Sequence, residues 1–86
     1  MSEADRGEPD LKSWAEAIAR DLVDRPERVE VRLVREEDAD VLEVAVDPDE
    51  MGRVIGRQGR TAQALRSLLS AASSKHGRTY DLEIVD

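Results

Sequence analysis

The sequence predicts one α+β domain in which a three-stranded mixed sheet is covered on one face by three helices. Three observations carry this prediction. One segment near the start and two consecutive segments in the second half show helical periodicity, and three further segments alternate apolar with polar residues. In chain order these segments read α-β-β-α-α-β. The length of 86 residues fits a single small domain.

The first helix is predicted over residues 10–24. Its apolar residues fall at i, i+3, i+4, i+7 and i+11 along one helical face, and they are Leu11, Trp14, Ala15, Ile18 and Leu22. Asp10 is a suitable N-cap, and Pro26 lies just beyond the expected end. Because Trp14 stands within the apolar stripe, we expect it to anchor the core rather than to stack on a nucleobase.

Three strands are predicted over residues 28–37, 41–47 and 79–86, because apolar residues recur there with a period of two. Their core-facing residues are Val29, Val31, Leu33, Leu42, Val44, Val46, Tyr80, Leu82 and Ile84. The polar segment 36–40 is predicted to be a turn, so that the first two strands form a hairpin. The third strand follows a helix pair, which favours a right-handed crossover connection.

The helix pair begins with a short helix after the second strand. Asp47 is expected to cap it, with Pro48 at its first position and Glu50 at the capping-box spacing from Asp47. Gly56 is expected to end it.

The longer helix is predicted over residues 60–77. Its apolar stripe, with Leu68 beside it, consists of Ala62, Leu65, Leu69 and Ala72. Gly77 is a good stop signal, and Lys75 and His76 suit the negative end of the helix dipole. His76 is the only histidine, so we interpret it as a helix-end residue and not as a metal ligand or catalytic base.

Charge is distributed unevenly along the chain. The net charge is −7, yet residues 1–50 hold 17 acidic and 7 basic residues, while residues 51–86 hold 6 basic and 3 acidic ones. No acid occurs between Met51 and Tyr80, and the bases in that stretch are Arg53, Arg57, Arg60, Arg66, Lys75 and Arg78. Because contacts depend on local charge, the acidic total does not exclude a polyanionic ligand.

The segment GRVIGRQGRTAQALR, residues 52–66, holds the clearest functional pattern. Gly56 and Gly59 permit a tight turn between two helices and a close approach of another backbone. The start of the second helix favours phosphate, and Arg57, Arg60 and Arg53 add positive charge nearby. Such a turn is suited to holding a sugar-phosphate backbone.

Other site classes fit the sequence poorly. A Walker loop requires a lysine before the Ser or Thr and a preceding strand, and a dinucleotide fold requires G-x-G-x-x-G after a strand. This sequence contains neither motif. For an isolated G-x-x-G, a plain helix-turn-helix corner remains an alternative. There is no cysteine, one histidine and no paired carboxylate with a reason to be buried. We therefore predict no catalytic residues, no metal site, no cofactor and no enzymatic activity.

The combination of Val54-Ile55-Gly56-Arg57-Gln58-Gly59 with the α-β-β-α-α-β order resembles the KH domain of type II, in which a GXXG loop holds about four nucleotides. The segment DEMGRVIGRQGRTAQALR is similar to DMGKVIGKQGRTAKAIR, a phrase typical of the KhpA family of small single-domain bacterial KH proteins. The resemblance covers residues 10–86. Arg57 replaces the loop lysine common in the family, and this replacement keeps the charge.

The resemblance implies binding of single-stranded RNA. Gly56 and Gly59 would allow close approach, and Arg57 and Gln58 would face the phosphates. The flanking residues implied or considered are Arg53, Ile55, Arg60, Thr61 and Arg66, where Ile55 would line an apolar groove for bases. The family further implies an RNA chaperone or post-transcriptional regulator that acts with a protein of the KhpB (Jag/EloR) family, self-associates, and affects cell elongation and envelope growth.

Residues 1–9 are predicted to be a disordered acidic tail, and residues 10–86 the KH domain. No signal peptide opens the chain and no apolar run approaches the length of a membrane span, so a cytoplasmic location away from membranes is expected. The alternative function is a dimerisation or assembly module with a KH fold, in which RNA contact is secondary. Acidic replacements at Arg57 and Gln58 would separate the two functions.

Overall fold

The predicted elements are present in the predicted order. The computed structural model describes residues 10–85 apart from the side chain of His76, so the predicted tail over residues 1–9, the last residue and the role of that side chain lie outside the described part. The helices and strands are α2 (Leu11–Leu22), β1 (Glu30–Arg35), β2 (Ala39–Ala45), α3 (Met51–Ile55), α4 (Arg60–His76) and β3 (Thr79–Val85). Short 3-10 turns lie at Pro26–Arg28, Pro48–Glu50 and Arg57–Gly59.

The sheet is mixed and has the order β1-β2-β3. β1 pairs antiparallel with β2, as the predicted hairpin requires, and β2 pairs parallel with β3. Leu42 lies opposite Leu33 on one side and Leu82 on the other. Because side chains alternate along each strand, this register places one apolar row across all three strands on the same face. The predicted sheet and its inward-facing residues are confirmed.

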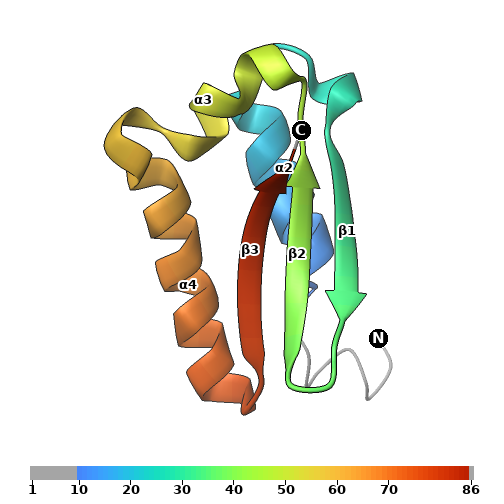
Figure 1. The fold of residues 1–86 in the computed structure, drawn as a ribbon, viewed down its shortest axis with the longest axis vertical. Coiled ribbons are helices and arrows are strands. Elements are labelled where there is room, and N and C mark those ends of the chain that lie inside the picture. The colour runs from blue at the N-terminus through green and yellow to red at the C-terminus, as the bar shows by residue number, and fades with distance from the viewer. Residues whose placement is uncertain (1–9, 86) are drawn as a thin grey trace.

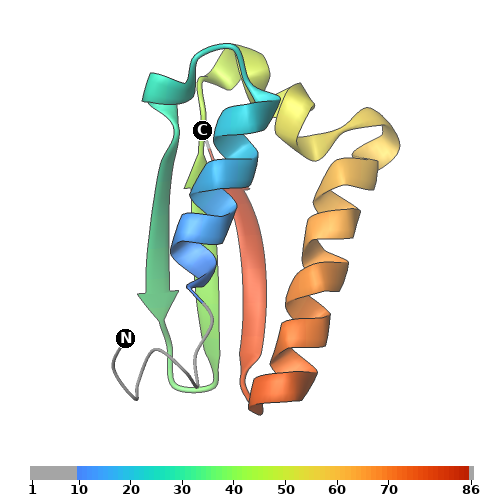
Figure 2. The ribbon, with the colours of Figure 1, turned by 180° about the vertical axis from the view of Figure 1, so that it is seen from behind.

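α2 lies against the apolar face of the sheet, and α4 runs along the edge formed by β3. In Figure 1 the sheet stands in front with α2 behind it, and α4 runs beside β3; Figure 2 shows α2 crossing the back of the sheet. Trp14 is half-buried and packs against the core, as expected of an anchor. The fully buried large side chains are Leu42, Leu69 and Val54, one each from the sheet, α4 and α3. Within residues 10–85 no helix has the length and apolar character needed to cross a membrane.

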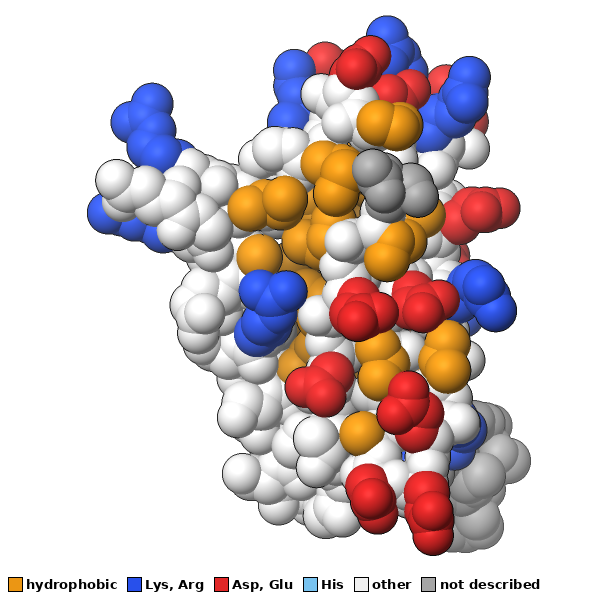
Figure 3. All heavy atoms as spheres, in the orientation of Figure 1, with side chains coloured by type: hydrophobic (Ala, Val, Ile, Leu, Met, Phe, Trp, Pro, Cys, Tyr) orange, Lys and Arg blue, Asp and Glu red, His pale blue; other side chains and the backbone are white. Residues whose placement is uncertain are grey.

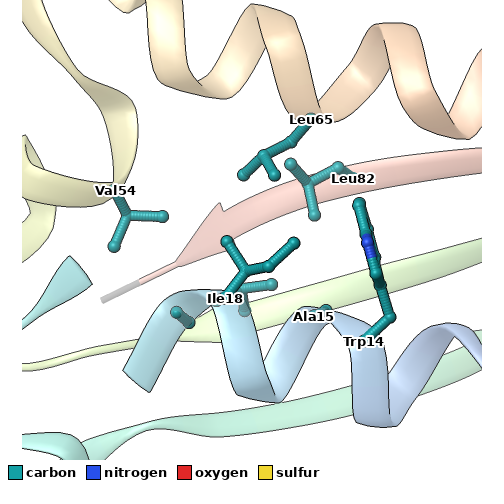
Figure 4. A pocket seen from close by; sticks show the side chains of 8 residues that line it. Trp14, Ala15, Ile18, Val54, Leu65 and Leu82 are labelled. Atoms are coloured by element: carbon teal, nitrogen blue, oxygen red, sulfur yellow. The ribbon is translucent and has the colours of Figure 1, made fainter. Parts of the chain in front are cut away.

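One small apolar cavity marks the point where these layers meet. It has a volume of about 10 Å³, and Figure 4 shows α2, α3, α4 and the sheet directing side chains into it. The lining residues are Trp14, Ala15, Ile18, Ala19, Val44, Val54, Leu65 and Leu82. A void of this size barely holds one water molecule and offers it no polar partner, so it is a packing defect and not a ligand site.

Two carboxylates have roles that the sequence interpretation missed. Asp40, predicted to lie in the polar turn, belongs to β2 and is buried, where Arg78 holds it through two hydrogen bonds of 2.6 and 3.3 Å. The capping-box role of Glu50 is wrong. Its buried carboxylate instead accepts hydrogen bonds from the backbone N–H groups of Asp24 and Arg25, in the connection that follows α2. Asp47 does cap its turn, accepting from the Asp49 N–H at 3.0 Å.

Candidate nucleic-acid interface

The turn between α3 and α4 is built from left-handed backbone. Gly56, which ends α3, has φ 82° and ψ 166°, Gln58 has φ 57°, and Gly59 has φ 74°. Two short hydrogen bonds close the turn: the Gly56 N–H donates to the Gly52 carbonyl at 2.8 Å, and the Gly59 N–H donates to the Gly56 carbonyl at 3.0 Å. The chain therefore turns tightly from α3 into α4 within four residues, as the glycine spacing predicts.

The two glycines are needed for different reasons. A Cβ atom added at Gly56 would lie 2.3 Å from Thr61 Oγ1 and 2.7 Å from the Thr61 backbone nitrogen, so no side chain fits. A Cβ atom at Gly59 would meet nothing within 4 Å, and only the positive φ favours glycine there. Thr61 is half-buried against Gly56, so its first role is to support the turn.

Positive charge is concentrated at this turn. Arg57 and Arg60 are exposed, and an Arg60 guanidinium nitrogen donates to Gln58 Oε1 at 3.3 Å. α4 begins after Gly59 with no side-chain cap and no acid in its first turn. The N–H groups of Gly59 and Arg60 donate to the carbonyls of Gly56 and Arg57, so the helix start contributes its positive dipole end. Basic side chains project from this corner of the molecule in Figure 3. Together these groups form a site that suits an extended chain of phosphates.

The third predicted arginine of the site is already paired. Arg53 forms a two-pronged ion pair with Asp24, with N–O distances of 2.9 and 3.2 Å. Both side chains are largely exposed, so the pair is weak and can exchange for another anion. The structure thus groups Arg57, Gln58 and Arg60 at the turn and directs Arg53 toward the connection after α2.

A polar groove runs from this end of the molecule between α4 and β3. It has a volume of about 510 Å³, and its lining residues are Gln63, Arg66, Ser67, Ser70, Ser73, Ser74, Thr79, Tyr80 and Asp81. Figure 3 shows that acidic side chains gather over the sheet while α4 carries few charges. The guanidinium of Arg66 spans the groove and donates to the Leu82 carbonyl at 3.4 Å. The half-buried Ile55 does not line this groove.

The groove could not be placed from the sequence, because its two walls belong to segments that only the fold brings together. One signal was nevertheless present. Four uncharged polar residues of α4 recur at i, i+4, i+7 and i+11, and they are Gln63, Ser67, Ser70 and Ser74. This spacing marks one helical face that is neither apolar, as a core face would be, nor charged, as a solvated face usually is.

No group of three or more His, Cys, Asp or Glu side chains able to hold a metal ion occurs in the described part of the chain. The arrangement offers cationic groups and the positive end of the α4 dipole at the turn, and hydroxyl, amide and carboxylate groups in the groove.

Comparison with known proteins places this geometry in a family. The sequence model of the family described as "KhpA/KhpB, KH domain" matches residues 12–84. The RNA-binding protein KhpA of Halalkalibacterium halodurans is 47% identical over 78 residues, covering 88% of this chain and all of that protein. The proteins of the same name from Aquifex aeolicus and Clostridium perfringens are 45% and 44% identical, over 88% and 87% of this chain and 96% and 100% of their own lengths. No solved structure matches the chain at a significant level.

Proposed function

This chain belongs to the KhpA/KhpB family of KH domains, and we propose that it binds single-stranded RNA through the turn Gly56-Arg57-Gln58-Gly59. The observation that carries the proposal is the left-handed turn that bears Arg57 and Arg60 at the uncapped start of α4. The names of its relatives describe an RNA-binding protein and no catalytic activity, which supports the same function.

In this mechanism the turn holds phosphates and the groove receives bases. At Gly59 the space where a side chain would stand is open, so a ribose-phosphate chain can approach the turn there, whereas at Gly56 that space is filled by Thr61. Arg57 and Arg60 neutralise adjacent phosphates and release counterions. The bases then lie in the groove between α4 and β3. A single site of about four nucleotides binds weakly, and a second copy or a second KH domain would raise the avidity.

The family membership supports the further parts of the proposal. These are an RNA chaperone or post-transcriptional regulator in the cytoplasm, a partner of the KhpB (Jag/EloR) type, self-association, and an effect on cell elongation and the envelope. One observation favours association with another protein: Leu68 on α4, beside the core-facing stripe, is 56% exposed and is the only large apolar side chain so exposed within residues 10–85. Such an exposed side chain suits a contact surface, although a single one is common on monomers.

The testing experiment measures binding of short single-stranded RNA by fluorescence anisotropy across a salt series. The variant Arg57→Asp with Gln58→Asp reverses the charge of the turn, and we expect it to abolish binding. The native protein should lose affinity steeply as salt rises, because phosphate contacts release counterions. The matched control is Lys12→Asp with Ala17→Asp, which makes the same total change of charge on exposed positions of α2. We expect this control to retain most of the binding.

Thermal unfolding of each variant shows that a loss of binding is not a loss of fold. If the turn variant binds as well as the native protein, or if the native protein binds no RNA at low salt, the turn is only a corner between helices. The assembly-module function would then take first place, and binding of a KhpB-type protein by the folded turn variant would support it.

A further inference from the structure

We propose that Asp81 makes this site selective for bases that carry an exocyclic amino group, and against uracil, at one position of the bound strand. The inference rests on the proposed RNA binding and concerns the groove between α4 and β3. Asp81 is the only acidic side chain among the described residues that line this groove.

The carboxylate of Asp81 is available to a ligand. It is exposed on β3, and within residues 10–85 it takes part in neither a side-chain hydrogen bond nor a salt bridge. The one cation in the groove lining, Arg66, is directed to the Leu82 carbonyl. Asp81 therefore forms no ion pair with Arg66, and it lies on the β3 side of a groove whose α4 side consists mainly of uncharged polar residues.

Charge also orients a bound strand so that bases, not phosphates, face Asp81. The arginines stand at the α3–α4 turn, whereas the outer face of the sheet is acidic. Glu83 lies on that face two residues from Asp81, and Glu43 lies opposite Glu83 on β2, where it also forms a long ion pair of 3.9 Å with Arg32. Phosphates are repelled by this surface and held at the turn. The bases of the same nucleotides then turn toward β3, where Asp81 lies.

An ionised carboxylate only accepts hydrogen bonds, and this fact decides which bases it favours. Cytosine, adenine and guanine each present an amino group as a donor on the Watson–Crick edge. Uracil presents one ring N–H between two carbonyl oxygens. A carboxylate that approaches this N–H also comes close to at least one carbonyl oxygen, and the two acceptors repel each other. Cytosine and uracil are the sharpest comparison, since they have the same ring size and differ mainly on this edge.

The experiment compares binding of six-residue cytidine and uridine RNA oligonucleotides to the whole protein, by fluorescence anisotropy at fixed low salt. We expect the native protein to bind the cytidine strand about tenfold more tightly. Asp81→Asn can donate from its amide to a uracil carbonyl, so the ratio should fall to near one. Glu83→Gln is the matched control, because it removes the same charge from the same face of β3 but outside the groove lining. It should raise both affinities slightly and leave the ratio unchanged.

The inference is overturned, while RNA binding stands, by a native protein that binds both strands equally or by an Asp81→Asn variant that keeps the native ratio. A ratio lost equally in Glu83→Gln would also overturn it, because general repulsion and not contact would then set the preference. Absence of any binding by the native protein is a different failure, since it refutes the proposed function itself. Amide hydrogen exchange of each variant confirms that β3 remains folded.

Discussion

The two glycines of the turn are under different constraints, which the G-x-x-G motif alone does not distinguish. Gly56 and Gly59 are equivalent in the G-x-x-G pattern, but only Gly56 lies against another residue. We predict that Gly56→Ala lowers the free energy of unfolding by more than about 2 kcal/mol, because strain and a clash with Thr61 add. Gly59→Ala should cost about 1 kcal/mol, from the backbone conformation alone. Urea denaturation of the two variants measures the difference.

A second substitution tests the origin of the larger cost. Adding Thr61→Ala to Gly56→Ala removes the closest atom, Oγ1, but leaves the Thr61 backbone nitrogen 2.7 Å from the new Cβ. We therefore expect only partial recovery of stability. Equal costs for Gly56→Ala and Gly59→Ala would show that Thr61 does not confine the turn.

Gln58 shows where prediction from sequence fails at the scale of a residue. The G-x-x-G spacing predicts the turn and the need for glycine at both of its ends. Nothing about a glutamine predicts φ 57°, and within residues 10–85 Gln58 is the only non-glycine residue with positive φ. The sequence likewise placed Arg53 near the turn but gave no sign that Asp24, 29 residues earlier, holds it.

At the scale of elements, the start of α2 depends on a titrating cap. The Ser13 N–H donates to Asp10 Oδ1 at 3.1 Å, and this hydrogen bond lowers the pKa of Asp10 below its ordinary value of 3.8. A hydrogen bond from the Asp49 N–H is likewise the main cause of the lowered pKa of Asp47. Folding thus favours the ionised form of both caps. The stability that each contributes is complete above pH 3.8 and is lost as pH falls through its lowered pKa.

We predict that Asp10→Asn leaves the stability near pH 6 almost unchanged, because asparagine caps helices about as well as aspartate. Between pH 5 and about pH 2, the variant should lose less stability than the native protein, since one titrating cap is gone. Urea denaturation at a series of pH values checks this. Identical pH profiles would mean that the charge of Asp10 does not contribute to stability. In the variant, the dependence of the free energy of unfolding on pH that remains includes the contribution of Asp47.

Periodicity predicted each helix and strand well, since each buries one face and the pattern of that face is local. What it missed are contacts between elements. Ser73 of α4 accepts a hydrogen bond from the Tyr80 N–H at 2.9 Å and donates to the Leu69 carbonyl, so a helix side chain satisfies the edge of β3. Asp40 ends a polar run and is predicted to lie in a turn, whereas in the structure it is held by Arg78, 38 residues away. Partners so distant in sequence leave no periodic signal.

At the scale of the molecule, a small core with few aromatics is supplemented by polar contacts at its two ends. The end that carries the α3–α4 turn is fixed by Glu50, which binds the backbone after α2. The opposite end is fixed by Asp40 and Arg78, which join the start of β2 to the residue before β3. β2 spans seven residues, or about 20 Å, and separates the two contacts. Each contact therefore supports a different end of the same sheet.

We predict that Glu50→Gln and Asp40→Asn each lower the free energy of unfolding by about 1 to 3 kcal/mol. Glu50→Gln places an amide N–H donor against the backbone N–H donors that Glu50 binds. Asp40→Asn removes the negative charge that pairs with Arg78. Because the sites share no contacts and lie far apart, the double variant should show the sum of the two losses within about 0.5 kcal/mol. Urea denaturation followed by circular dichroism and by Trp14 fluorescence measures all three. Coincident transitions with additive losses would show one cooperative unit, whereas separated transitions would show that the end bearing the α3–α4 turn unfolds independently of the sheet.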